Sequence, residues 1–276
     1  MAVRTLSPVD IAVWLWFDHA ETGDYNAVNA PLMWQVFLVA VVTDLATGLG
    51  ALPFAFSRSL SRKWEGVSCA IAGGMMISAS VFSLAEQGLR RGRVWEIVLG
   101  MLAGALFFWL TSRFMEGNRW QIADLSREDS KQAVLIIAAM FVHSIPEGLA
   151  IGVGYATGDL RFGLLLAVAI AVHNIPEGIA VSVPLRTKGV SILRCAGWAI
   201  FTSVPQPLFA VPAFLLVSVF HPLLPFGLGF AGGAMIFLVA AELMPESAAN
   251  CSKSENAWAF MLGFVLMLLF TSGLGL

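Results

Sequence analysis

Charged residues are scarce in this sequence. Only 12% of its 276 residues are Asp, Glu, Lys or Arg, whereas 58% are hydrophobic and the mean hydropathy is +0.80. A typical soluble domain has about 25% charged and about 45–50% apolar residues. The composition therefore excludes an ordinary soluble domain and predicts an all-α, polytopic membrane protein. A net charge of −2, with no basic cluster outside the loops, gives no support for nucleic-acid binding.

Cysteines are few, and a nucleotide-binding motif is missing. The three cysteines, Cys69, Cys195 and Cys251, are far apart and form no C-x-x-C pair. This spacing argues against a disulfide framework and against a thiolate metal site. The sequence contains no G-x-x-x-x-G-K-[ST] string, so ATP is not expected to drive its activity directly.

Long apolar runs dominate what is present. A helix needs about 20 apolar residues to cross the hydrocarbon core, and the sequence offers eight such spans. We therefore divide the chain into a leader, residues 1–30, with a Trp-rich interfacial segment, and an eight-span domain, residues 31–276. The eight predicted spans are 33–57, 66–89, 94–115, 131–157, 161–185, 191–219, 223–245 and 256–275.

Lysine and arginine are unequally divided between the two sides that these spans define. Counted loop by loop, one side has eleven and the other has five. The richer side faces the cytoplasm by the positive-inside rule, so both termini are expected on the non-cytoplasmic side. A plasma or inner membrane is the first expectation, with an organelle membrane as the alternative. The eleven residues are Arg58, Arg62, Lys63, Arg113, Arg119, Arg127, Lys131, Arg186, Lys188, Arg194 and Lys253.

Two internal repeats stand out. "FVHSIPEGLAIGV" and "AVHNIPEGIAVSV" match at an offset of 30 residues, in the fourth and fifth spans. "AGGMMI" and "AGGAMI" match at an offset of 159, so spans 1–3 resemble spans 6–8. An odd number of crossings separates the two halves, which predicts a 3+2+3 inverted repeat with a substrate site near the midplane.

The strings "VHSIPEG" and "VHNIPEG" carry the chemistry. His143 and Glu147 are four residues apart, as are His173 and Glu177, so each pair lies on one helix face. Two imidazoles and two carboxylates are a plausible shell for Zn²⁺ or another first-row divalent ion. The alternative is that the pairs only hydrogen-bond between helices. Two buried carboxylates cost too much for that alternative, so metal or proton binding is favoured.

An eight-span chain with paired H-x-x-P-E-G strings resembles the ZIP (Zrt/Irt-like protein) family of divalent metal transporters, from about Pro31 to its end. The resemblance implies transport through a site, often binuclear, formed by spans 4 and 5. It implies that the protein is not an enzyme and has no cofactor. The metal is the substrate: zinc is the first expectation, and Fe²⁺, Mn²⁺ and Cd²⁺ are the alternatives. The implied metal ligands are His143, Glu147, His173, Asn174 and Glu177.

Two positions depart from the commoner family pattern. Ser144 stands where the first motif usually has Asn, and Gln206, in "TSVPQPLFAVP", stands where the family often has Glu. The two motif glutamates balance one divalent ion, and a second ion would lack its usual third carboxylate. We therefore expect one firm metal site and a weak second one with Gln206, Ser144 and Asn174 as ligands. Gln206 as a purely interhelical hydrogen-bonding residue remains open.

Several other features stay undecided at this stage. Asp44, inside the first span, is either a pathway residue or a cap for a helix break near Gly48. Glu86, Glu242 and Glu246 fall near span ends and are candidates for an exit route. A homodimer is compatible with the sequence. The alternative function is an intramembrane metal-dependent hydrolase, which the lack of an H-E-x-x-H motif disfavours.

Overall fold

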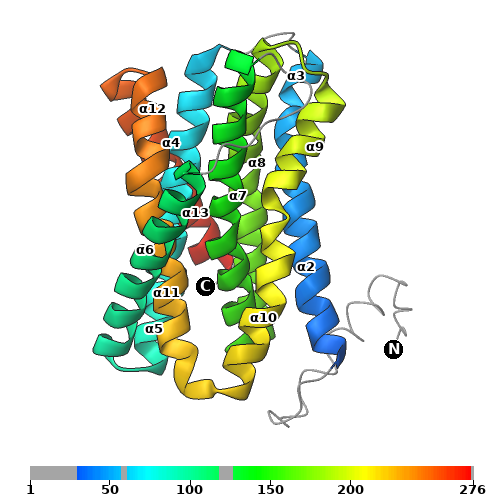
Figure 1. Ribbon diagram of the computed structural model, residues 1–276. Helices are drawn as coiled ribbons and strands as arrows, with labels where there is room; N and C mark the ends of the chain where they lie inside the picture. The colour runs from blue at the N-terminus through cyan, green and yellow to red at the C-terminus, as the bar shows by residue number, and fades with distance from the viewer. Residues whose placement is uncertain (1–29, 57–60, 118–126, 275–276) are drawn as a thin grey trace, which may run out of the picture.

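The computed structural model describes residues 30–56, 61–117 and 127–274, and it describes their side chains except at 115–136, 139 and 274. Every secondary-structure element in these ranges is a helix (Figure 1). This agrees with the all-α prediction and with the physical constraint that lipid imposes, because a helix satisfies its own backbone hydrogen bonds. The predicted leader, residues 1–30, lies outside the described residues except for Ala30.

The helices follow one another with short connections. In chain order they are α2 (Ala30–Gly48), η1 (Leu49–Ala51), α3 (Pro53–Phe56), α4 (Arg62–Ala79), η2 (Ser80–Ala85), α5 (Glu86–Arg91), α6 (Val94–Gly117), α7 (Arg127–Ala156), α8 (Leu160–Thr187), α9 (Ile192–Ser203), α10 (Pro205–Val219), η3 (His221–Leu223), α11 (Leu224–Leu238), η4 (Val239–Leu243), α12 (Met244–Asn250) and α13 (Lys253–Leu274).

Within the described part of the chain, seven helical segments are long and apolar enough to cross a membrane. They coincide with seven of the eight predicted spans. The predicted fourth span falls on α7, a 30-residue helix that is not among the seven and whose first ten side chains are not described. The chain is therefore a multi-pass membrane protein, and the count of eight spans remains a prediction.

Three of the long segments change their helical winding part-way. The first passes from α-helix into a 3₁₀ turn after Gly48, the position of the helix break in one of the two interpretations of Asp44. The π-helical turns η2 and η4 interrupt the segments Arg62–Arg91 and His221–Asn250. These two turns begin at Ser80 and Val239, which are 159 residues apart, so the predicted repeat extends to an unusual local geometry.

Glycine contacts show how the two repeated segments run. A Cβ atom at Gly66 would lie 2.9 Å from the Cβ of Asn250, and one at Gly92 would lie 2.3 Å from Cγ of Pro225. The start of Arg62–Arg91 therefore lies beside the end of His221–Asn250, and the end of Arg62–Arg91 lies beside the start of His221–Asn250. The two segments are antiparallel, which is the relation that an inverted repeat requires.

Equivalent glycines also make equivalent contacts. A Cβ at Gly74 would lie 2.1 Å from the carbonyl oxygen of Phe260, and one at Gly233 would lie 2.2 Å from that of Met101. Gly74 and Gly233 are related by the offset of 159, and so are Met101 and Phe260. Backbone-to-backbone packing of α4 on α13 thus matches that of α11 on α6. These contacts support the predicted 3+2+3 arrangement.

The helices form two groups. In the first, α7 packs along α10 and α8 packs along α2, with α9 beside them (Figure 1). The second contains α4 with α13 and α6 with α11, together with α5 and α12. Close backbone approaches at the described glycines fall within a group, whereas the groups meet through side chains, as at Val153 and Gly227. The site described below lies in the first group, and the two groups meet most extensively where α4 packs along α8.

Candidate metal centre

Three ionisable side chains from the two repeated motifs converge. Glu147 from α7 and His173 and Glu177 from α8 place one ligand atom each within 4.8 Å of the others. All three side chains are buried, at 0–2% exposure. The imidazole Nε2 of His173 lies 3.0 Å from Oε1 of Glu147. We call these three residues the central cluster.

The central cluster has the chemistry of a divalent metal site. Imidazole nitrogen and carboxylate oxygen are both zinc ligands, and three protein ligands are enough for a zinc site that keeps a fourth position open. Zinc–ligand distances of about 2.1 Å put the ligand atoms of a tetrahedral shell about 3.4 Å apart. The observed separations of up to 4.8 Å require only a small contraction around an ion. The two carboxylates together balance the charge of one divalent cation.

The motif glycines bring a third and a fourth helix against the cluster. A Cβ at Gly148 would lie 2.5 Å from the carbonyl oxygen of Gln206, and one at Gly178 would lie 1.9 Å from that of Thr47. Neither position therefore has room for a side chain, and α10 and α2 approach the backbone directly. Thr47 and Gln206 are also 159 residues apart, so the two motif glycines pack against equivalent positions of the two repeats.

Gln206 binds to the central cluster and to two further residues. Its Nε2 donates to Oε2 of Glu147 at 2.5 Å. Its Oε1 accepts from the hydroxyl of Thr43 at 2.6 Å and from Nδ2 of Asn174 at 3.3 Å. The structure thus gives Gln206 the interhelical hydrogen bonds that the sequence left open as an alternative to metal ligation.

Asn174 presents an oxygen that has no donor. Its Nδ2 donates to the carbonyl of Thr43 at 2.9 Å, which fixes the amide. Among the described residues, neither its Oδ1 nor Oε1 of Glu177 has a hydrogen-bond partner, although both atoms are buried. A buried acceptor without a donor is costly, and a bound cation removes that cost. The unsatisfied oxygens therefore fit the predicted ligand roles of Asn174 and Glu177.

Ser144 and His143 do not join the central cluster. The hydroxyl of Ser144 donates back to the carbonyl of Met140 in its own helix, at 3.3 Å. His143 instead contacts Glu242 of η4, with 2.8 Å between Nε2 and Oε2. The other oxygen of Glu242 accepts from the hydroxyl of Ser112 at 2.7 Å. The structure thus divides the predicted His₂Glu₂ set into a three-residue cluster and a separate His143–Glu242 pair.

Glu242 is the residue that the sequence placed least well. Its position near a span end suggested a carboxylate at the membrane interface and a candidate for an exit route, without a partner. In the structure its side chain is 26% exposed and reaches a histidine that is 2% exposed. Glu242 belongs to the π-helical turn Val239–Leu243, whose extra residue rotates the helix face that follows. No hydropathy pattern reports such a turn; the match of its position with η2 appears only in the structure.

Asp44 is a further buried carboxylate, at 6% exposure. Its Oδ1 has no hydrogen-bond partner within the described ranges. The preceding residue, Thr43, binds both Gln206 and Asn174. Asp44 therefore lies one residue from the hydrogen-bond network around the central cluster.

Comparison with known proteins gives one family. A family model described as the ZIP zinc transporter matches residues 121–271. Zinc transporter GufA of Myxococcus xanthus is 34% identical over 249 residues, which covers 86% of this chain and 98% of that protein. Zinc transporter ZIPB of Bordetella bronchiseptica is 35% identical over 248 residues, covering 83% of this chain and 78% of that protein.

A longer relative is also similar. A protein of Arabidopsis thaliana, provisionally named as a zinc transporter, is 42% identical over 250 residues. The match covers 90% of this chain but only 39% of the plant protein. The relatives are thus named as transporters and not as enzymes, and they differ in total length.

Proposed function

Because the chain belongs to the ZIP family of zinc transporters, we propose that it carries divalent metal ions, zinc foremost, across a membrane toward the cytoplasm. The observation that carries this proposal is the convergence of Glu147, His173 and Glu177, buried and within 4.8 Å of one another. Such a group inside a membrane protein is costly unless it binds a cation or a proton. The relatives' names supply zinc as the first substrate to test.

The route of the ion follows from the side chains that surround the cluster. An ion that sheds its water is held by Glu147, His173 and Glu177, with Asn174 Oδ1 as an additional oxygen. The His143–Glu242 pair supplies the next ligands along the route. Its Glu242 side chain is 26% exposed, so the pair leads from the buried cluster toward solvent. The lysine and arginine asymmetry of the loops places the exposed end of α12 on the cytoplasmic side. The metal gradient supplies the energy.

Alternating access requires the cluster to open to one side and then to the other. Its ligands lie on α7 and α8, and the contacts at Gly148 and Gly178 attach these helices to α10 and α2. We therefore infer that the whole first group moves as one unit. The second group forms the surface against which it moves.

Uptake into proteoliposomes tests the proposal. Purified protein in sealed vesicles is expected to accumulate radioactive Zn²⁺ without ATP, and Glu177→Ala and Glu177→Gln are expected to abolish accumulation. Glu255→Gln is the matched control, since Glu255 is a partly exposed carboxylate paired with Lys63. Competition by Fe²⁺, Mn²⁺ and Cd²⁺ then ranks the substrates. Wild-type rates in the Glu177 variants would refute transport through this cluster.

A further inference from the structure

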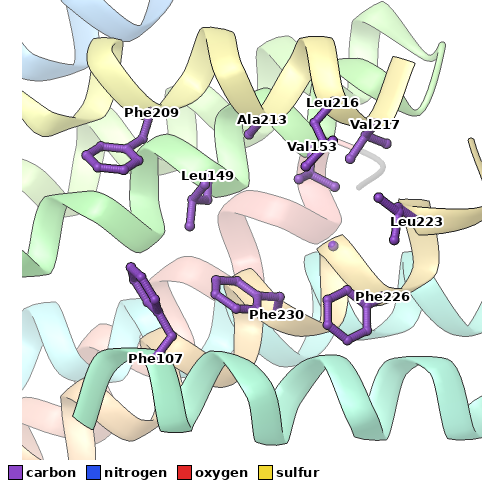
Figure 2. A pocket seen from close by; sticks show the side chains of 11 residues that line it. Phe107, Leu149, Val153, Phe209, Ala213, Leu216, Val217, Leu223, Phe226 and Phe230 are labelled. Carbon is purple, nitrogen blue, oxygen red and sulfur yellow. The ribbon is translucent and has the colours of Figure 1, made fainter. Parts of the chain in front are cut away.

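An apolar pocket lies between the two helix groups, away from the metal centre. Its volume is about 280 Å³. Figure 2 shows Phe107 and Phe230 on one side and Leu149, Val153 and Phe209 on the other. These residues belong to α6 and α11 of the second group and to α7 and α10 of the first. The pocket is thus one of the places where the groups meet without filling the space between them.

The pocket is elongated along the helices. Val217 and Leu223, at the α10–η3 connection, line one end, and Phe209, eight residues earlier on α10, lines the other. Eight helical residues span about 12 Å. Half of the hydrocarbon core is about 15 Å thick. The pocket therefore extends over most of one leaflet.

The walls exclude polar occupants. Every lining residue is apolar or glycine. A metal ion or a water molecule would find no partner there, so neither is a stable occupant. Leu216, at the wall, is 60% exposed, as expected for a side chain that faces lipid. An unbranched hydrocarbon chain entering from the bilayer matches both the shape and the chemistry.

Positively charged side chains lie near the end of the pocket that Val217 and Leu223 line. The α5–α6 turn packs on α11 there, since a Cβ at Gly92 would meet Pro225, next to the lining residue Phe226. Arg93 follows Gly92, and its side chain is exposed. A neighbouring carboxylate, Glu96, accepts from the backbone N–H of Arg93 at 2.7 Å, so Arg91 and Arg93 together leave this end with a net positive charge. Arg91 lies at the same end, with its guanidinium 6.0 Å from the ring centroid of Phe162. A guanidinium pairs well with a phosphate in planar, bidentate geometry.

We propose that this pocket binds one acyl chain of an anionic phospholipid from the leaflet at the α5–α6 turn, with its phosphate at Arg93. The bound chain fills the space between α7 and α10 on one side and α6 and α11 on the other. Leu149, in its wall, is two residues from Glu147 of the central cluster. The lipid thus contacts the helix that carries a metal ligand, and it stabilises the relative position of the two groups.

Native mass spectrometry tests this proposal without any transport measurement. The intact chain is reconstituted in nanodiscs of equal phosphatidylglycerol and phosphatidylcholine, and retained lipids are counted after release. One phosphatidylglycerol per chain is expected. Val153→Phe, which fills the pocket, and Leu216→Trp, which closes its mouth, are expected to remove it. Because a basic residue at an anionic membrane surface is worth about 1 kcal/mol, Arg93→Gln should lower the preference for phosphatidylglycerol about 5-fold.

Arg113→Gln is the matched control, because Arg113 is exposed at the opposite end of α6, beside Trp109. It should leave the preference unchanged. Each variant is first checked for monodisperse elution and an unchanged melting temperature; if Val153→Phe unfolds, the more exposed Leu216→Trp decides. Equal lipid retention in the filled pocket, an unchanged preference in Arg93→Gln, or a lipid-free dimer would each overturn the proposal.

Discussion

Gln206 is the residue that links the central cluster to the rest of its helix group. It donates to Glu147 and accepts from Thr43 and Asn174, so its amide joins α10 to α7, α2 and α8. It contributes no charge. The two glutamates of the cluster therefore face one divalent ion at neutrality, and a second ion would leave an excess of two positive charges in a medium of low dielectric constant.

Replacing Gln206 by glutamate supplies the missing charge. We predict that the wild-type chain binds about one Zn²⁺ or Cd²⁺ tightly and that Gln206→Glu raises this toward two, since a third carboxylate offsets the second ion. Equilibrium dialysis with metal analysis measures the stoichiometry. Gln206→Met, which is uncharged and similar in volume, is the control and should remain near one. Two tight ions in the wild type would contradict the charge count.

The His143–Glu242 pair is predicted to act in release and not in binding at the cluster. Glu242→Gln keeps the shape and the contact with Ser112 but removes the charge that attracts a cation away from the cluster. Zinc affinity should change less than about 3-fold, whereas uptake should fall about 10-fold, a difference of about 1.4 kcal/mol in a barrier. Binding titration and vesicle uptake on the same preparation separate the two. An equal loss in both would assign the pair to the binding site itself.

At the scale of helices, close backbone contact holds each group together. Gly74 and Gly233 both face a carbonyl oxygen at a distance where no Cβ fits. Gly197 in α9 is exposed, and a Cβ added there would have no neighbouring atom within 4 Å. The three glycines therefore differ in what an added methyl group would meet, although all three lie inside helices.

Substitution by alanine should separate these cases. Gly74→Ala and Gly233→Ala are predicted to destabilise the protein by about 1–3 kcal/mol each, because α4–α13 and α6–α11 must move apart. Gly197→Ala should be neutral or stabilise by up to about 1 kcal/mol, because alanine favours the helix. Thermal unfolding followed by size-exclusion elution ranks the variants. A loss at Gly197 equal to that at Gly74 would refute the packing explanation.

The sequence predicted the helices well and the site in part. Apolar runs and charged loops placed seven segments within a few residues of their observed ends, because hydrocarbon thickness dictates their length. The doubled motif also singled out Glu147, His173 and Glu177, which the structure brings together. Spacing along one helix gives the shared face of His143 and Glu147, but not which neighbouring helix each side chain meets. That choice depends on the π-helical turn η4, which contains Glu242, and on how this turn packs. Neither leaves a periodic signal in the sequence.

For the whole molecule, the difference between contacts within and between groups predicts how the protein moves. Thr47 and Ser203 touch within the first group, with their hydroxyl oxygens 2.7 Å apart. Val153 and Gly227 touch across the groups, since a Cβ at Gly227 would lie 3.3 Å from both Val153 methyl groups. Both pairs are close enough for a disulfide after replacement by cysteine.

Disulfides at these two pairs should have opposite effects. In a background without the three native cysteines, oxidised Val153→Cys/Gly227→Cys is predicted to stop zinc uptake, and a reductant should restore it, because the crosslink ties the two groups together. Oxidised Thr47→Cys/Ser203→Cys should transport before and after reduction. Uptake in vesicles, with crosslinking followed by mass spectrometry, gives the answer. Uptake that continues across the first crosslink would refute movement between the groups.

The central claim is that one imidazole and two carboxylates from the paired motifs hold the transported ion. Zinc X-ray absorption on the purified, zinc-loaded chain tests it most directly. We predict nitrogen and oxygen ligands at about 2.0–2.2 Å, no sulfur at about 2.3 Å, and an imidazole signal that falls in His173→Gln. A sulfur ligand, or an unchanged spectrum in His173→Gln, would contradict the account.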